Sequence, residues 1–278
     1  VTFPKGYNSF YCMKYEITQQ QYSDFLNTLT TTQQNNRFPN SFNNYRHYIK
    51  LVNGIYGCDG NNNDKLNEVD DGQNIACNNI DWMDGTAYAD WSGMSPMTEL
   101  EYEKACRGTQ IPVPNEYAWG STFMQSSSGI EKSRTSEEIT TRTSDNIVGF
   151  MNGNRGPIRV GAFAKSGSTR EQAGASYYGI MELSGNLYES IVTVGNIQGR
   201  EFLAINANGV LDSNGNADVV NWPYYQSYDL GVPGSGLRGS NWSHFSEYVS
   251  ERGDATYRRN FGRDGGFGFR CCVRSVSP

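Results

Sequence analysis

Residues 236–274 form a glycine-rich, aromatic and polar stretch with neither the spacing of an amphipathic helix nor the alternation of a half-buried strand. Such a stretch cannot bury a continuous apolar face, so we expect irregular surface chain held at both ends by regular structure. It opens on Arg238-Gly239-Ser240-Asn241-Trp242 and closes on Gly268-Phe269-Arg270-Cys271. Any fold for this chain must hold these two ends and leave the middle at the surface.

The overall composition argues against several classes of protein. The 278 residues carry a net charge of -6, whereas a nucleic-acid-binding surface needs a basic patch, so we expect no nucleic-acid partner. No apolar run is as long as a membrane-spanning helix, so we expect no direct membrane insertion. Two histidines, and six cysteines without a Cys-x-x-Cys pair, disfavour a zinc site and a histidine-dependent triad. With no repeat and no clear linker, residues 1–278 are predicted to form one domain.

Local patterns predict short helices separated by irregular chain. Residues 16–30 begin with a Thr-x-x-Gln capping box at Thr18, and residues 97–108 begin with a Thr-x-x-Glu box at Thr98. We interpret the carboxylates of the second helix as capping and surface groups. The remaining predictions are a short helix over residues 84–92, strands over residues 10–15 and 158–163, and a long surface connection over residues 31–53.

An Asn- and Asp-rich segment follows that connection. Five of its side chains fall at positions 1, 3, 5, 9 and 12 of an EF-hand-like calcium loop: Asp59, Asn61, Asn63, Asn67 and Asp70. Position 6, which is usually glycine, is Asp64, so a solvated loop without metal is the alternative interpretation. Cys58 and Cys77 lie on either side of the loop and could form a disulfide in an oxidising compartment.

Four motifs in a fixed order resemble the formylglycine-generating enzyme (sulfatase-modifying factor) family. The first is Tyr15-Glu16-Ile17-Thr18, and the second runs from Pro96-Met97-Thr98-Glu99 to Cys106-Arg107-Gly108. The third is Gly185-Asn186-Leu187-Tyr188-Glu189, and the fourth joins the two ends of residues 236–274. The resemblance spans nearly the whole chain and implies an α+β fold of the C-type lectin type, with small antiparallel sheets and a few short helices.

The resemblance also implies a calcium site and a disulfide. Calcium in the family is held around the third motif, which matches the side chains of Glu182 and Glu189 and the carbonyls of Gly185 and Leu187. Calcium prefers several oxygen ligands, and two carboxylates would offset its charge. The alternative is a tight turn between two solvated glutamates. The family's disulfide matches Cys106 and Cys271.

The catalytic residues of the family are absent from this chain. Active members bind copper through two cysteines, which match Ser243 and Tyr248 here. A hydroxyl and a phenol cannot replace thiolate ligands of copper(I), so we expect neither copper nor formylglycine generation.

We therefore expect a binding protein that displays residues 241–265, which we call the display region. The predicted ligand-binding residues are Asn241, Ser243, His244, Phe245, Ser246, Tyr248, Val249, Tyr257, Arg259, Asn260, Phe261, Arg263 and Asp264. They mix adaptable polar groups with flat aromatic rings, as antibody paratopes do. The expected partner is a protein or glycan, and the expected location is extracellular, at a cell surface or on a virion.

Some lectin-fold proteins of this family are variable proteins of diversity-generating retroelements. In these, AAC codons for asparagine become NNC codons, which can encode seven residues of the display region: Asn241, Ser243, His244, Phe245, Ser246, Tyr248 and Val249. Glu247 cannot arise in this way and would be a fixed position. The alternatives are an enzyme or accessory factor that uses His244 with Ser243 and Glu247, or a structural module of the cell surface.

Overall fold

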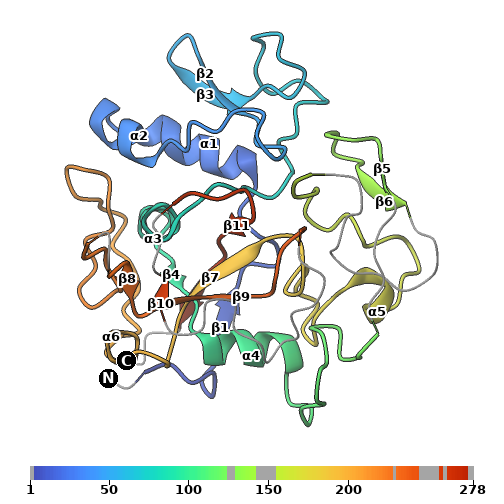
Figure 1. The fold of residues 1–278 in the computed structure, drawn as a ribbon, viewed down its shortest axis with the longest axis vertical. Coiled ribbons are helices and arrows are strands. Elements are labelled where there is room, and N and C mark those ends of the chain that lie inside the picture. Colours follow the sequence, from blue (N-terminus) through green and yellow to red (C-terminus); the bar gives the residue numbers. More distant parts are fainter. Residues whose placement is uncertain are drawn as a thin grey trace.

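The computed structural model describes residues 3–123, 129–141, 155–227, 230–243, 257–258 and 262–274, and in these residues regular structure comes in short pieces (Figure 1). The helices are α1 (Gln19–Thr28), α2 (Thr31–Arg37), α3 (Trp82–Trp91), α4 (Glu99–Arg107), α5 (Arg170–Ala173) and α6 (Ile197–Arg200). The two sheets that organise the molecule lie between α1 with α2 at one end and α4 at the other (Figure 1).

Most strand pairs in the described residues are antiparallel. The strands are β1 (Phe10–Cys12), β2 (Ile49–Val52), β3 (Ile55–Cys58), β4 (Ser95–Pro96), β5 (Gly129–Glu131), β6 (Ile139–Thr141), β7 (Tyr188–Val192), β8 (Val232–Pro233), β9 (Ser235–Arg238), β10 (Tyr257–Arg258), β11 (Phe267–Gly268) and β12 (Cys271–Arg274). One sheet has the order β1-β12-β4 and another β11-β7-β9, in which β11 and β7 are parallel. Hairpins or pairs β2-β3, β5-β6 and β10-β8 complete the set. Both ends of residues 236–274 thus lie in sheets, as the sequence predicted.

The helix starts follow the local signals in the sequence. Thr18 accepts a hydrogen bond from the backbone N–H of Gln21 at the start of α1, and Thr98 caps α4 in the same way. The helix predicted at residue 84 begins two residues earlier, because the Asp81 side chain caps α3 and its box is completed by Asp84.

Three predictions about the fold are wrong. Helix α2 lies within the predicted surface connection, and its own capping box joins Thr30 to Gln33. No strand forms over the described residues 158–163, where Arg159 makes only an isolated bridge with Ile75. The third concerns the carboxylates of α4, predicted as capping and surface groups: Glu101 does take part in the cap, but Glu99 and Glu101 are buried.

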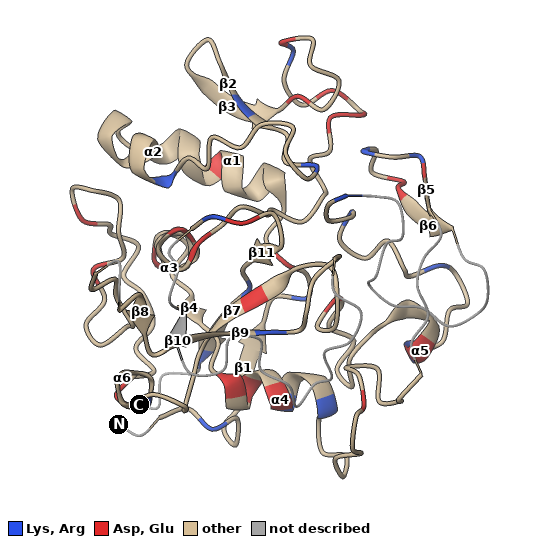
Figure 2. Ribbon diagram, in the orientation of Figure 1, with Lys and Arg blue, Asp and Glu red and all other residues tan. Residues whose placement is uncertain are grey.

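Glu99 and Glu101 of α4 are buried because arginines from two strands neutralise them. Glu101 accepts hydrogen bonds from Arg274 of β12, including one of 2.7 Å from its Nε atom. Glu99 pairs with Arg238 of β9 at 3.4 Å. Figure 2 shows acidic residues along α4, below β9. The ion pairs fasten α4 to both sheets.

All six cysteines are free thiols in this structure, so neither predicted disulfide is formed. Successive side chains of a strand point to opposite faces of the sheet. Cys271 of β12 therefore points away from the face on which Cys106 of α4 packs. Cys271 packs in the core that contains Trp82, whereas its neighbour Cys272 packs in the core that contains Cys106.

The second predicted pair, Cys58 and Cys77, lies close together. Burial raises the pKa of the Cys77 thiol, and the nearby Cys58 raises it further. The two residues nevertheless remain thiols. No helix in the described ranges is long and apolar enough to cross a membrane.

Candidate functional site

The two ends of the display region meet at one place on the scaffold. The indole N–H of Trp242 donates a hydrogen bond of 2.8 Å to the carbonyl of Gly265. The backbone N–H of Trp242 donates to the carbonyl of Asn186, also at 2.8 Å. A side chain at residue 266 would place its Cβ only 2.0 Å from Nδ2 of Asn241, so this position requires glycine. We call residues 241–243 with 262–266 the base of the display region.

Asn186 connects the base to the interior. Its backbone is left-handed, with φ of 61°, a conformation that asparagine adopts more readily than most residues. Its side-chain oxygen accepts a hydrogen bond of 2.9 Å from the N–H of Ile158, and its amide donates to the buried carboxylate of Glu16. Glu16 also accepts the N–H of Leu187 at 3.1 Å. The third and first sequence motifs therefore meet directly beneath the base.

Arg263 holds the C-terminal side of the base. Its guanidinium donates two hydrogen bonds to the carboxylate of Asp84, from Nε at 2.7 Å and from Nη2 at 2.8 Å. It also donates to the carbonyls of Phe38 at 3.0 Å and Asn36 at 2.6 Å. The neighbouring carboxylate of Asp84 outweighs the effect of burial and raises the pKa of Arg263, so the group is charged at every ordinary pH. No motif or spacing in the sequence indicates that this arginine makes a structural contact.

A loop from the N-terminal part of the chain covers the other side of the base. Tyr45, with a positive φ of 52° and 41% of its surface exposed, packs on Trp242 with ring centroids 5.2 Å apart. Asn78 donates to the carbonyls of both Tyr45 at 2.8 Å and Gly265 at 3.2 Å. Sequence reasoning missed this contact, because it joins segments almost two hundred residues apart without a shared motif.

The structure divides the predicted ligand-binding residues into two groups. Asn241 is only 5% exposed, and its side-chain oxygen accepts hydrogen bonds from the N–H and hydroxyl of Ser243, both at 2.8 Å. Asn241 is therefore buried in the base, and Arg263, whose side chain is 24% exposed, is held by bonds within the protein; their role as ligand contacts stays a prediction. Ser243 and Asp264 are exposed.

The other predicted ligand-binding residues lie outside the described residues or are described only as backbone. Tyr257 is described as part of β10, which pairs with β8. The positions outside the described residues are His244, Phe245, Ser246, Tyr248, Val249, Arg259, Asn260 and Phe261.

Three buried carboxylates lie around the predicted calcium site. Burial raises the pKa of Glu16, of Glu189 and of Glu182, the last to about 7. The charge of Glu189 raises the pKa of Glu16 and of Glu182 further, and Glu182 also raises that of Glu16. Arg270 opposes this effect, because its Nη2 and Nε atoms donate to Oε1 of Glu189 at 2.7 and 2.9 Å. The charge of Arg159 also lowers the pKa of Glu182, and the cluster still keeps an excess of negative charge when all three carboxylates are ionised.

The donors of this cluster fit a bound cation only in part. Oε2 of Glu182 and Oε2 of Glu189 are buried and have no hydrogen-bond partner among the described residues. The other oxygen of Glu189, however, already has the counter-ion Arg270. Within the described residues, no three His, Cys, Asp or Glu side chains are arranged to hold a metal ion. A cation here would use Glu182 most directly, together with main-chain carbonyls such as those of Gly185 and Leu187.

The ammonium group of Lys50 reaches into the EF-hand-like loop. The ammonium of Lys50 lies 2.9 Å from Oδ2 of Asp59 and 2.9 Å from Oδ1 of Asn62, and it also pairs with Asp64. The amide of Asn63 donates to Glu68 at 2.6 Å instead of pointing an oxygen inward.

The remaining predicted ligands of this loop are also used within the protein. The side chain of Asn67 accepts the N–H of Cys58 at 2.9 Å, the amide of Asn61 donates to Asp70 at 3.3 Å, and Asp70 lies 3.6 Å from Arg134. Calcium in this loop stays a prediction, and it would have to displace Lys50.

Burial shifts the pKa of the described thiols and of His47. Burial raises the pKa of all six cysteine thiols, to about 12 for Cys12 and Cys58. Burial also lowers the pKa of His47 to about 4, so it is neutral at pH 7, with Nδ1 3.0 Å from the side-chain oxygen of Asn78. Ser243, at one of the family's catalytic positions, bonds only to Asn241 among the described residues, and Tyr248 lies outside them.

These features define a lectin-like α+β scaffold that holds a surface region by its two ends. The chain matches the sulfatase-modifying factor enzyme 1-like domain over residues 5–275 and belongs to that family. Its fold is accordingly the C-type-lectin-like fold of the formylglycine-generating enzyme type, as the four motifs predicted. No curated protein matches the chain.

Proposed function

We propose that this protein is a non-catalytic ligand-binding protein that presents residues 243–262 on a constant scaffold. The observation that carries the proposal is the closed base, where Trp242 bonds to Gly265 and Arg263 bonds to Asp84. A region held in this way can change its side chains without disturbing the scaffold. The ligand is a protein or glycan met outside the cell or at its surface.

The thiol chemistry supports a role without catalysis. Oxygen activation in the family needs two copper-binding thiolates, and the matching positions are Ser243 and Tyr248. All six thiols of this chain are elsewhere, and burial disfavours their ionised forms.

We further propose that the display region is diversified by a retroelement, within limits set by the base. Asn241 is buried and bonded, so it should be constant even though an AAC codon could be rewritten. The candidate variable positions are then Ser243, His244, Phe245, Ser246, Tyr248 and Val249. The surrounding DNA should contain a near-copy of this coding segment that differs only at adenines, next to a reverse transcriptase gene. Absence of such a copy would refute diversification and leave the binding scaffold standing.

Binding is tested with a variant that changes no residue of the base. Phe245 and Tyr248 replaced together by alanine remove two aromatic side chains of the display region, whereas the control Ser9→Ala changes an exposed serine just before β1. Both proteins are applied to glycan arrays and to extracellular protein libraries. Ligands retained by the control and weakened by the double variant support the proposal. Equal binding by both proteins, or catalytic turnover of a cysteine-containing sulfatase peptide with copper, favours an enzymatic, accessory or structural role.

We also propose that calcium binds at Glu182, Gly185, Leu187 and Glu189. Three buried carboxylates outnumber the nearby guanidinium groups of Arg270 and Arg159 and provide the negative charge, and the free oxygen of Glu182 provides a ligand. The metal would stabilise the turn that carries Asn186, and so the base of the display region.

A further inference from the structure

Three of the six cysteines lie on one face of the β1-β12-β4 sheet. Cys106 and Cys272 are buried in the same core cluster, and Cys12 packs against it. Cys271 points to the opposite face, into the core with Trp82 and Phe269. The thiols nearest to one another by topology are therefore not the pair that the family resemblance implies.

The register of β1 and β12 places Cys12 directly opposite Cys272. The N–H of Met13 donates to the carbonyl of Cys271 at 3.1 Å, so residues 13 and 271 form a hydrogen-bonded pair. Such pairs alternate with non-hydrogen-bonded ones, which makes Cys12 and Cys272 a non-hydrogen-bonded pair with Cα atoms about 4.5 Å apart. Disulfides span Cα separations of about 4.4–6.8 Å, so this pair needs no movement of the strands.

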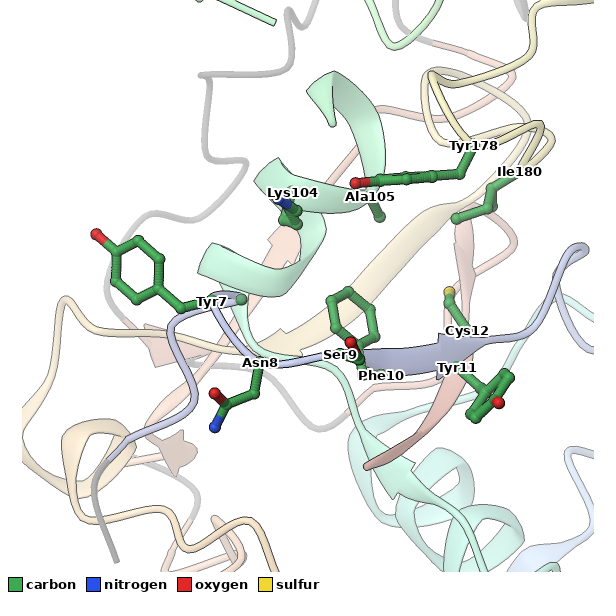
Figure 3. A pocket seen from close by; sticks show the side chains of 11 residues that line it. Tyr7, Asn8, Ser9, Phe10, Tyr11, Cys12, Lys104, Ala105, Tyr178 and Ile180 are labelled. Atoms are coloured by element: carbon green, nitrogen blue, oxygen red, sulfur yellow. The ribbon is translucent and has the colours of Figure 1, made fainter. Parts of the chain in front are cut away.

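A small molecule can reach one thiol of the pair. Cys12 lines a half-open cavity of about 420 Å³ between β1 and α4. Figure 3 shows its sulfur pointing toward Ile180 and Tyr178, on the cavity side of the strand. Cys272 is 1% exposed. Cys12 is thus the thiol that an external oxidant meets first.

We propose that Cys12 and Cys272 form a cross-strand disulfide by exchange with a small disulfide such as oxidised glutathione. The Cys12 thiolate attacks one glutathione sulfur, which forms a mixed disulfide and releases one glutathione thiolate. The Cys272 thiolate then attacks the Cys12 sulfur and releases the second glutathione. Two protein thiols lose two protons and two electrons, and one oxidised glutathione becomes two reduced ones.

The bond would join the first strand of the chain to its last. Burial raises the pKa of Cys12 to about 12, so the reactive thiolate is scarce at neutral pH. Exchange in the folded protein should therefore be slow at pH 7 and accelerate about tenfold per pH unit up to pH 9. The inference is independent of what the display region binds.

The experiment uses the full chain, oxidised with glutathione at alkaline pH, alkylated and digested with trypsin without reduction. The expected product links residues 6–14, which contain Cys12, to residues 271–274. Because that second peptide contains both Cys271 and Cys272, fragmentation between them and the variant Cys271→Ala assign the bond. The link should persist in Cys271→Ala and in the matched control Cys106→Ala, and vanish in Cys12→Ala.

Stability gives a second readout on the unmutated protein. The closed loop is very long, so oxidation should raise the melting midpoint by at least about 5 °C, and dithiothreitol should reverse this. A link from residues 105–107 to residues 271–274 would overturn the assignment in favour of Cys106. The assignment would also be overturned if Cys12 of the folded protein stays a free thiol under conditions that oxidise the thiols of the denatured chain.

Discussion

Replacing Arg263 with alanine should release the C-terminal side of the base while leaving the fold in place. The substitution removes two hydrogen bonds to Asp84 and two to the carbonyls of Asn36 and Phe38. The Asp84 side chain is fully buried, so it would lose its main counter-ion. Removing one partner of a buried ion pair costs about 3–5 kcal/mol of unfolding free energy.

A second arginine moderates this cost. Nη1 of Arg37 lies 3.3 Å from Oδ1 of Asp84 and would still neutralise part of its charge. We therefore expect a loss of about 2–4 kcal/mol, since one counter-ion remains. For a domain of this size, that loss corresponds to a melting midpoint lower by roughly 5–15 °C.

Thermal melting by circular dichroism and limited proteolysis test this prediction together. Trypsin should cleave Arg263→Ala at Arg252, Arg258 or Arg259 about 10–100-fold faster than the unchanged protein, because loss of the clamp favours local opening. Arg155→Ala, at an exposed arginine, is the matched control and should change neither measurement. A midpoint within about 1 °C of the unchanged protein, with equal cleavage rates, would show that Arg263 does not hold the base.

Three further predictions concern the carboxylate cluster and the missing chemistry. Calcium at a hundredfold excess over Kd should raise the unfolding free energy by up to about 2.7 kcal/mol and so raise the melting midpoint. Glu182→Gln should reduce this response, and a midpoint that a chelator leaves unchanged counts against the site. Without calcium, stability should fall as pH rises from about 5 to about 7, because the pKa of Glu182 is raised from 4.5 to about 7 and the folded state holds the proton longer. Urea titrations across this range should show a loss of up to about 3 kcal/mol from Glu182 that is missing in Glu182→Gln, where only the smaller set of Glu16 and Glu189 still titrates. Equal profiles in the two proteins would be inconsistent with a raised pKa at Glu182. With copper and a cysteine-containing sulfatase peptide, an oxygen electrode should record no consumption above the buffer rate, and measurable turnover would contradict the loss of catalysis at Ser243 and Tyr248.

The helices that the sequence predicted are those with a strong local signal. The capping boxes at Thr18 and Thr98 act within four residues, so their geometry does not depend on the rest of the fold. The box at Thr30 is equally local, yet α2 was missed because its Asn- and Gln-rich sequence has no apolar face. Its helix is stabilised by tertiary contacts instead, such as the hydrogen bond of 2.8 Å from Gln33 to the carbonyl of Asp212.

Residues of the candidate site were harder to assign, because burial of a polar side chain depends on distant partners. Asn241 and Arg263 are residue types that are common in binding surfaces. Only the contact of Asn241 with Gly266 and the hydrogen bonds of Arg263 to Asp84 show that they are held within the protein. Lys50 is a similar case. It lies nine residues before Asp59 in the chain, and the β2-β3 hairpin brings its ammonium group to the Asp59 carboxylate. A calcium-loop spacing identifies oxygen ligands but not a competing ammonium.

The contacts at the base explain how a scaffold can tolerate change in the region that it displays. Trp242 bonds to the carbonyls of Gly265 and Asn186 through its side chain and backbone. Backbone carbonyls are present whatever the neighbouring side chains are, so these bonds do not depend on residues 244–261. The positions of the base that contact the scaffold through their own shape or charge must be fixed, namely the glycines at 265 and 266, Asn241, Trp242 and Arg263. Sequence variation confined between these positions would therefore change what is bound without changing how the region is held.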